Sequence, residues 1–76
     1  MITIYSTPVC KYCNDAKAFF KKHNLEYKEI NVAEDQEARA YIMELTGRTS
    51  VPVIIIGDQA VVGFDEALLT KLTEVG

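Results

Sequence analysis

ITIYSTPVCKYC, the stretch from residue 2 to residue 13, joins a predicted β-strand to the first turn of a predicted helix. Residues 2–5 are rich in β-branched and aromatic side chains, and the polar segment Ser6-Thr7-Pro8 ends this strand. Apolar side chains then recur at helical spacings, at Cys13, Ala16, Phe19 and Phe20. The pattern predicts a helix over residues 11–22, with Cys10 at its N-terminal edge.

The rest of the chain predicts a strand, a helix, two strands and a last helix. A strand is expected over residues 27–32, and the helix after it ends at Gly47 and packs through Ala38, Tyr41, Ile42 and Leu45. Residues 53–56 and 60–62 form an apolar hairpin around a tight turn. The last helix runs from Asp65 to about Val75, with an apolar face of Leu68, Leu69, Leu72 and Val75.

This order of elements predicts one α/β domain over residues 1–76. The first helix is about as long as the strand next to it, so the first two strands should be parallel and joined by a right-handed crossover. The hairpin makes the last two strands antiparallel neighbours.

Composition and charge exclude several classes of partner. The 76 residues carry a net charge of −3 with a pI near 5.0, and their basic side chains are scattered, which argues against nucleic acid. No stretch approaches the roughly 18 apolar residues of a membrane span, and the first residues lack a basic, apolar leader. We therefore expect a cytoplasmic monomer with no membrane partner.

The two cysteines carry the candidate chemistry. Cys10 lies near the unpaired N–H groups of a helix start, beside Lys11, and both features favour its thiolate. Cys13 lies one turn inside the helix on the inward face, where burial keeps a thiol protonated. This spacing predicts that Cys10 attacks a disulfide and Cys13 resolves the mixed disulfide that forms.

A metal site and roles for the remaining polar residues have less support. Half of a zinc site also uses this cysteine spacing, but the chain has no further cysteine and only one histidine, so no metal site is expected. His23 is expected at the far end of the first helix, as a surface residue. The carboxylates of residues 34, 35 and 37 are explained by the start of the second helix.

Pro52 precedes the apolar strand at residues 53–56 and has two interpretations. Proline at the first position of a strand can simply form a turn, because it has no N–H to donate. Alternatively, a cis Val51-Pro52 bond would leave the backbone groups of Val51 free to hold an extended peptide beside Cys10.

Three motifs in order make the chain resemble the glutaredoxin family along almost its whole length: IYS followed by CKYC, then GRTSVP, then VGFDEALL. The resemblance implies a thioredoxin-like fold with a four-stranded mixed sheet of order 2-1-3-4, three helices and the topology βαβαββα. It also implies a cis-proline at Pro52 and exchange of disulfides with glutathione as co-substrate and no bound cofactor. The implied glutathione-binding residues, beyond Lys11 and Tyr12 of the CKYC motif, are Val51, Pro52, Phe64 and Asp65.

Two departures from the family pattern concern the electron donor. The usual CPYC is CKYC here, and Thr7 stands where many members have a lysine that meets the glycyl carboxylate of glutathione. Arg48 is the expected substitute cation. The short chain and the Phe64 that follows Gly63 are also similar to redoxins that supply ribonucleotide reductase and are recharged by thioredoxin reductase.

The sequence therefore leaves three functions to compare. The principal hypothesis is a glutathione-dependent oxidoreductase that reduces protein disulfides and glutathione mixed disulfides through Cys10 and Cys13. The second is the redoxin recharged by thioredoxin reductase. The third, of a different class, is a dimer that holds a [2Fe–2S] cluster through Cys10 with the help of glutathione.

Overall fold

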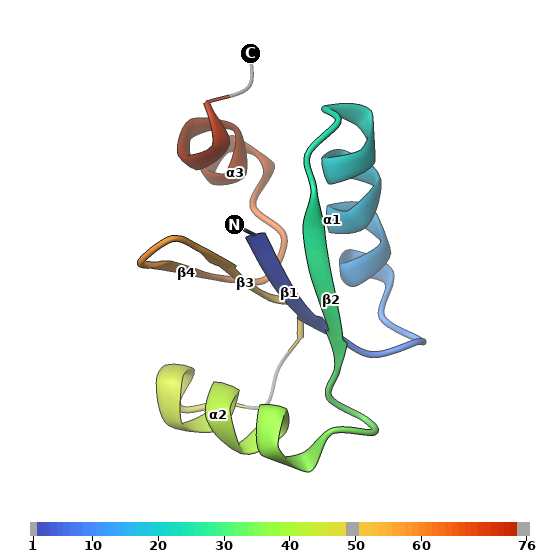
Figure 1. Ribbon diagram of the computed structural model, residues 1–76, viewed down its shortest axis with the longest axis vertical. Helices are drawn as coiled ribbons and strands as arrows, with labels where there is room; N and C mark the ends of the chain where they lie inside the picture. Colours follow the sequence, from blue (N-terminus) through green and yellow to red (C-terminus); the bar gives the residue numbers. More distant parts are fainter. Residues whose placement is uncertain (1, 49–50, 75–76) are drawn as a thin grey trace.

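The computed structural model, which describes residues 2–48 and 51–74, contains one four-stranded sheet of order β2-β1-β3-β4 (Figure 1). Its elements are β1 (Ile2–Ser6), α1 (Lys11–Lys22), β2 (Tyr27–Asn31), α2 (Gln36–Thr46), β3 (Val53–Ile56), β4 (Gln59–Val62) and α3 (Glu66–Thr73). β1 pairs parallel with β2 and antiparallel with β3, and β3 pairs antiparallel with β4. The predicted element order, sheet order and strand directions are confirmed. Thr49, Ser50 and Val75, which the predicted motifs and last helix include, lie outside the described residues.

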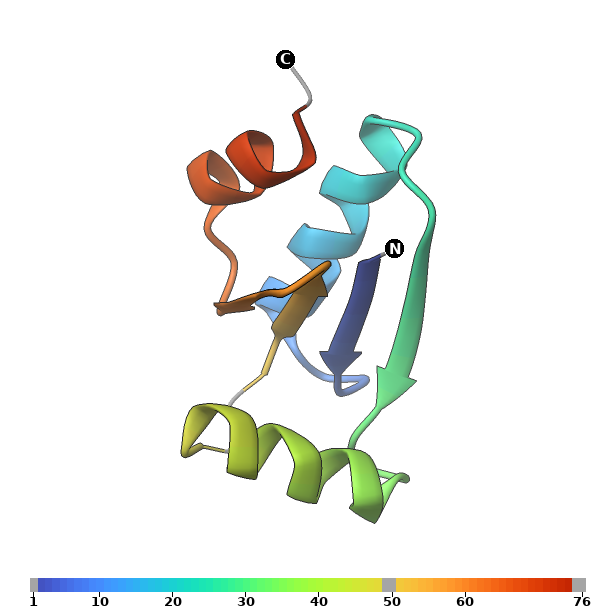
Figure 2. The same cartoon turned by 60° about the vertical axis from the view of Figure 1, so that its left-hand side comes forward.

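One face of the sheet packs against α1 and α3. Successive strand residues point to opposite faces, so alternate positions of β1, β3 and β4 share this side. The buried cluster here consists of Ile2, Ile4, Ile54 and Val61 from the strands with Ala16, Phe19, Phe20 and Leu69 from the helices. Figures 1 and 2 show both helices at the same end of the molecule, well away from α2. The predicted apolar stripe of α1 is thereby confirmed.

The opposite face of the sheet carries α2. Val53 and the partly buried side chains of Tyr5, Ile30 and Ile55 pack with Ala38 and Ile42 of this helix. Tyr41 and Leu45, which were predicted to pack inward, are 47% and 46% exposed. That prediction was wrong for Leu45 and holds in part for Tyr41, whose ring centroid lies 5.8 Å from that of Tyr5. A single helix on a small sheet buries only a narrow stripe, here Ala38 and Ile42, one turn apart.

The last helix shows the same effect. Leu69 is fully buried, whereas Leu68, which was expected on the same apolar face, is 38% exposed. The helix ends at Thr73 and leaves Glu74 in the left-handed region at φ 58°. A helix of this length presents one turn of side chains to the sheet, so only one of the two adjacent leucines can be fully buried.

The first and last turns of the helices are capped by side chains and by a glycine. Asp35 accepts a hydrogen bond from the Ala38 N–H at 3.0 Å and caps α2, whose C-cap is Gly47 at φ 76°. His23 is the C-cap of α1 and lies at the far end of that helix from Cys10, as predicted. None of the helices within residues 2–48 and 51–74 is long and apolar enough to cross a lipid bilayer.

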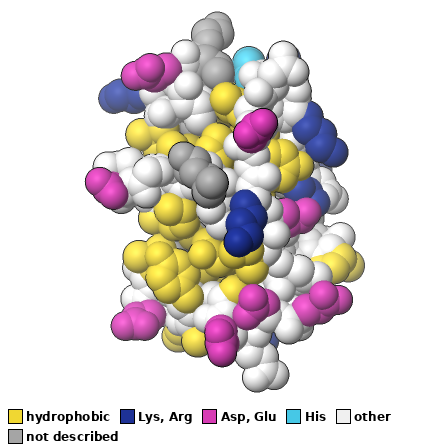
Figure 3. Space-filling model, in the orientation of Figure 1, with side chains coloured by type: hydrophobic (Ala, Val, Ile, Leu, Met, Phe, Trp, Pro, Cys, Tyr) yellow, Lys and Arg dark blue, Asp and Glu magenta, His cyan; other side chains and the backbone are white. Residues whose placement is uncertain are grey.

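The surface seen in Figure 3 combines apolar and acidic regions. Apolar side chains gather above α2, and Asp and Glu side chains surround that helix at the lower edge. The exposed large apolar residues on α2 and β4 are Tyr41, Met43, Leu45 and Val62.

Candidate active site

Cys10 occupies the N-cap of α1. After β1 ends, the chain turns so that the Cys10 N–H donates to the Thr7 carbonyl at 3.3 Å, and the helix begins at the next residue. The Cys10 sulfur accepts a hydrogen bond from the Cys13 backbone N–H at 3.1 Å. The sulfur therefore takes the place of the oxygen that usually caps a helix, at the positive end of the helix dipole.

Cys13 lies beneath Cys10 and is fully buried. The two residues form a disulfide, and their Cα atoms are 5.2 Å apart, within the range that a disulfide requires. Cys10 is partly exposed, so only the first sulfur can be reached by a large substrate. The roles of attacking and resolving thiol stay predictions, and an attacking role requires the accessible sulfur, which is that of Cys10.

Two further loops reach the same edge of the sheet as the cysteine turn. Tyr5 of β1 pairs with Val53, so the end of β1 lies beside the Val51-Pro52 segment that precedes β3. The Gly63 N–H donates to the Pro52 carbonyl at 2.8 Å and brings the end of β4 to this edge as well. The Val51-Pro52 bond is cis, as the second interpretation of this proline required, and the role of Val51 in holding an extended peptide stays a prediction. In Figure 2 the loop after β1 and the segment before β3 lie at the same end of the sheet.

The residues expected to bind glutathione differ in their burial. Pro52 is buried, and Val51 is half-buried against the α2 side of the core. Phe64 is half-buried with its ring centroid 6.3 Å from that of Phe19. Asp65 is exposed and accepts a hydrogen bond from the Leu68 N–H at 3.1 Å as the N-cap of α3.

The predicted cations and aromatic residue of the site are exposed. Lys11 and Tyr12 project from the first turn of α1, and the Tyr12 side chain is 59% exposed. Arg48 follows the C-cap of α2, where its backbone N–H and carbonyl bond to the Thr46 hydroxyl. The Arg48 side chain is exposed and makes no hydrogen bond or ion pair within the described ranges.

Arg39 was missed by the sequence analysis. A hollow of about 180 Å³ is lined by Thr7, Val32, Ala33 and Arg39. The Val32 N–H donates to the Ser6 carbonyl at 2.9 Å, which holds the end of β2 against the start of the cysteine turn. Arg39 therefore lies beside Thr7, where the family pattern has a lysine. One feature of the sequence indicated that Arg39 lies near Thr7: α2 was predicted to follow a strand parallel to the first, so its start should lie near the end of the first strand.

Val9 is the second residue that the sequence analysis missed. Its side chain is 94% exposed directly before Cys10, and the half-exposed Tyr12 ring follows two residues later. Single exposed apolar side chains are common on protein surfaces, and contiguous apolar surface is what marks a contact site. The two side chains add exposed apolar surface to the cysteine turn.

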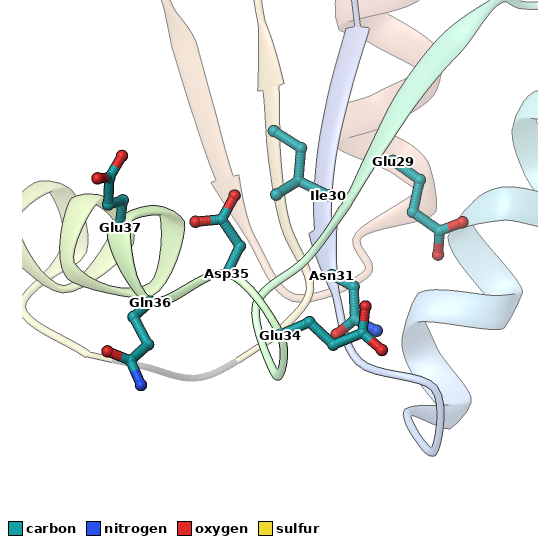
Figure 4. Close-up of a pocket in the computed structure, with 7 residues that line it drawn as sticks. All are labelled: Glu29, Ile30, Asn31, Glu34, Asp35, Gln36 and Glu37. Carbon is teal, nitrogen blue, oxygen red and sulfur yellow. The ribbon is translucent and has the colours of Figure 1, made fainter.

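A hollow of about 720 Å³ lies away from the cysteine turn. It lies where β2 passes into α2, and its lining is Glu29, Ile30, Asn31, Glu34, Asp35, Gln36 and Glu37 (Figure 4). The labelled carboxylates diverge: Glu29 points toward α1, whereas Asp35 and Glu37 point upward in the view, away from Glu34. Among residues 2–48 and 51–74, no group of three or more His, Cys, Asp or Glu side chains could hold a metal ion.

The Glu29 carboxylate at this hollow is hydrogen-bonded to other side chains of the protein. Its Oε2 accepts hydrogen bonds from Lys17 Nζ and Ser6 Oγ, each at 2.8 Å. The bond from Lys17, and then that from Ser6, lowers the pKa of the Glu29 carboxyl below its ordinary value. Asp35 caps α2, so the acidic group serves the helix start, as expected from sequence.

A CxxC disulfide on the N-terminus of α1, with a cis-proline loop at the same sheet edge, defines a thioredoxin-fold thiol–disulfide oxidoreductase. Residues 2–61 match the glutaredoxin family, and the chain belongs to that family. It is 40% identical over 74 residues to an uncharacterized glutaredoxin-like 8.6 kDa protein in a rubredoxin operon of Clostridium pasteurianum, covering 97% of this chain and 99% of that one.

Two further comparisons bear on the branch of the family and on the fold. The chain is 35% identical over 72 residues to the glutaredoxin-like protein NrdH of Lactococcus lactis, covering 95% of this chain and 99% of that one. The crystal structure of a variant of a thioredoxin-like protein superposes with a TM-score of 0.92 at 31% identity, covering 99% of this chain and 96% of that one. The thioredoxin-like fold expected from the family resemblance is confirmed.

Proposed function

We propose that this oxidoreductase uses glutathione as its co-substrate and reduces protein disulfides and glutathione mixed disulfides. The observation that carries this proposal is the position of the Cys10 sulfur, which caps α1 and is partly exposed, above a fully buried Cys13. The cap favours a thiolate at the one sulfur that a substrate can reach.

The exchange proceeds in two displacements that balance in atoms and electrons. The Cys10 thiolate attacks one sulfur of the substrate disulfide, that S–S bond breaks, and the other sulfur leaves as a thiolate. The Cys13 thiol loses its proton to solvent and its thiolate attacks Cys10, which releases the second substrate sulfur and forms the Cys10–Cys13 disulfide. Two molecules of glutathione then reduce this disulfide and become one molecule of glutathione disulfide.

Charge placement supports glutathione as the reductant. Glutathione carries two carboxylates and one ammonium group, and each has an opposite partner at this edge. Arg39 at the hollow beside Thr7 can meet the glycyl carboxylate. The N–H groups at the start of α3 can meet the other carboxylate, and Asp65 can meet the ammonium. The backbone of Val51 beside the cis bond can meet the cysteinyl part of the tripeptide.

The exposed apolar side chains at the cysteine turn support protein disulfides as substrates. Val9 and Tyr12, which flank Cys10 and Lys11 in the sequence, are both well exposed. Apolar and aromatic contacts are characteristic of the centres of protein interfaces.

A coupled assay tests the electron donor. The oxidised protein is supplied either with glutathione, glutathione reductase and NADPH, or with thioredoxin reductase and NADPH, and NADPH consumption is followed. We expect turnover with glutathione and a loss of about tenfold in Arg39→Ala, because a hydrogen bond to a charged group contributes about 1.5–3 kcal/mol. Arg48→Ala is the comparison variant at the cation expected from sequence, and we expect a smaller loss there, because Arg39 lines the hollow beside Thr7.

The second candidate is a redoxin recharged by thioredoxin reductase that supplies ribonucleotide reductase. Two observations favour it: the match to NrdH over nearly the whole of both chains, and Thr7 in place of the upstream lysine. Fast turnover with thioredoxin reductase alone, unaffected by Arg39→Ala, would establish this candidate and contradict the glutathione proposal.

A further inference from the structure

A second concave surface lies along α1, outside the cysteine turn. This groove of about 360 Å³ lies between α1 and the beginning of α3, and its lining is Asp15, Ala18, Phe19, Lys22, His23, Phe64 and Glu66. The Phe19 ring forms its apolar floor, with centroids 4.6 Å from His23 and 6.3 Å from Phe64. The small side chain of Ala18 leaves space above this floor.

The charges along the groove change sign with distance from Cys10. Asp15 lies at the end nearer the cysteine turn, and Glu66 adds a second carboxylate from the first turn of α3. Lys22 lies at the far end, seven residues and about 10 Å beyond Asp15 along the helix. A bound chain would therefore match the groove with a basic group near the reacting cysteine and an acidic group farther away.

The groove is continuous with the proposed glutathione site through Phe64. This residue lines the groove, and the next residue, Asp65, is the proposed partner of the glutathione ammonium. Glutathione is a tripeptide and would end at Asp65, whereas a polypeptide substrate could extend from there into the groove. Phe19 lies nine residues beyond Cys10, about 14 Å along the helix axis, which an extended chain covers in about four residues.

We propose that this groove binds the extended polypeptide segment next to the reacting cysteine of a substrate protein, an inference that rests on the function proposed above. The matching segment carries a basic residue about two positions from its cysteine, opposite Asp15. An apolar residue about four positions away lies on Phe19 and Phe64, and an acidic residue about five or six positions away lies opposite Lys22. The groove thereby selects among protein disulfides.

Synthetic peptides with this pattern test the proposal in a single turnover. The peptide cysteine is joined by a disulfide to 2-mercaptoethanol, and the pattern is placed on its N-terminal side in one peptide and on its C-terminal side in another. The pre-reduced protein attacks the peptide sulfur and releases 2-mercaptoethanol, after which Cys13 releases the peptide thiol. The protein is oxidised to its disulfide, and the peptide disulfide is reduced. Bis(2-hydroxyethyl) disulfide is the small control substrate.

Ala18→Trp fills the groove without touching the cysteine turn. At subsaturating concentration we expect it to slow the reaction of one of the two peptides about tenfold or more, because burial of one large apolar side chain contributes about 1.5–3 kcal/mol. The rate with bis(2-hydroxyethyl) disulfide should change less than twofold. Circular dichroism of the variant shows whether it is folded.

A charge exchange provides the second measurement. The double variant Asp15→Lys, Lys22→Glu should prefer a peptide with its basic and acidic residues exchanged, and the unchanged protein should prefer the original peptide. Equal rates for both peptides with both proteins, or an undiminished peptide rate in Ala18→Trp, would overturn the groove proposal. If the reduced wild-type protein reacted with neither the peptides nor the small disulfide, the proposed function itself would fail.

Discussion

The backbone N–H of Cys13 donates a hydrogen bond to the Sγ of Cys10 across 3.1 Å, so the first cysteine caps the helix that contains the second. The acceptor is favoured when it carries negative charge, because it faces the positive end of the helix dipole. The donor residue is fully buried and its own sulfur has no such environment. One hydrogen bond thus makes two cysteines, three residues apart, chemically unequal.

This inequality predicts opposite behaviour of the two single cysteine variants. Cys10→Ser should abolish all exchange activity. Cys13→Ser should block reduction of protein disulfides, which needs the resolving thiol, but retain removal of glutathione from mixed disulfides. The rate of alkylation by iodoacetamide is measured as a function of pH. For Cys10 in the Cys13→Ser variant, the pH of half-maximal rate should lie well below about 8.5, the pKa of an ordinary cysteine thiol. Faster alkylation of Cys13 in the Cys10→Ser variant at neutral pH would reverse the two roles.

Asp65 is predicted to have two separable roles, as a helix cap and as a charged partner of glutathione. Asp65→Ser keeps an N-cap side chain but removes the charge, so stability should be nearly unchanged while glutathione-dependent turnover falls about tenfold or more. Asp65→Ala should lose the same turnover and about 1 kcal/mol of unfolding free energy. Asp35→Ser, which alters the equivalent cap of α2, is the matched control and should leave turnover unchanged. Equal turnover of Asp65→Ser and the wild-type protein would leave Asp65 as a cap only.

Glu29 should contribute stability that depends on pH. Hydrogen bonds from Lys17 and then Ser6 lower the pKa of its carboxyl in the folded state. The contribution is therefore fully present above the ordinary pKa of an unfolded glutamate and is lost as pH falls through the lowered folded value. The side chain is 42% exposed, so solvent screening limits the effect, and Glu29→Gln should cost about 0.5–1 kcal/mol at neutral pH.

Urea unfolding at pH 7 and at about pH 3 measures this contribution. The difference between the wild-type protein and Glu29→Gln should shrink at the acidic pH, because the glutamate of the unfolded chain is protonated there and this proton uptake favours unfolding. Glu26→Gln is the control, because this exposed glutamate makes no side-chain hydrogen bond or ion pair among the described residues. A difference that stayed constant with pH would show that the charge of Glu29 is not responsible.

Two adjacent leucines of α3 offer a direct test of its packing. Leu69 is fully buried in the cluster with Ile54 and Val61, so Leu69→Ala should lower the unfolding free energy by about 2–4 kcal/mol through lost burial and a cavity. Leu68 is 38% exposed, and Leu68→Ala should cost less than about 1 kcal/mol. Chemical denaturation of both variants checks the pair. Similar losses would mean that α3 lies differently on the sheet.

Local pattern determined most of the fold and the reacting atoms of this protein. The alternation and helical spacing in residues 2–22 predicted a strand, a turn and a helix with Cys10 at its start, and the structure has these elements within a residue of the expected ends. Strand direction followed from connection lengths, since a hairpin turn forces antiparallel pairing and a helical crossover permits parallel pairing. These are short-range constraints, so the sequence by itself is sufficient to reveal them.

Tertiary structure alone decided which apolar side chains are buried and which distant residues join the site. Helical spacing predicts which face of a helix points toward the sheet. How many side chains on that face become buried depends on the size of the sheet, and this sheet is small, so Tyr41, Leu45 and Leu68 remain exposed. Arg39 reaches Thr7 only because the end of β2 is hydrogen-bonded beside β1, and the groove exists only because α3 begins beside Phe19. Such proximities join residues more than thirty positions apart, and sequence periodicity carries no information on contacts at that separation.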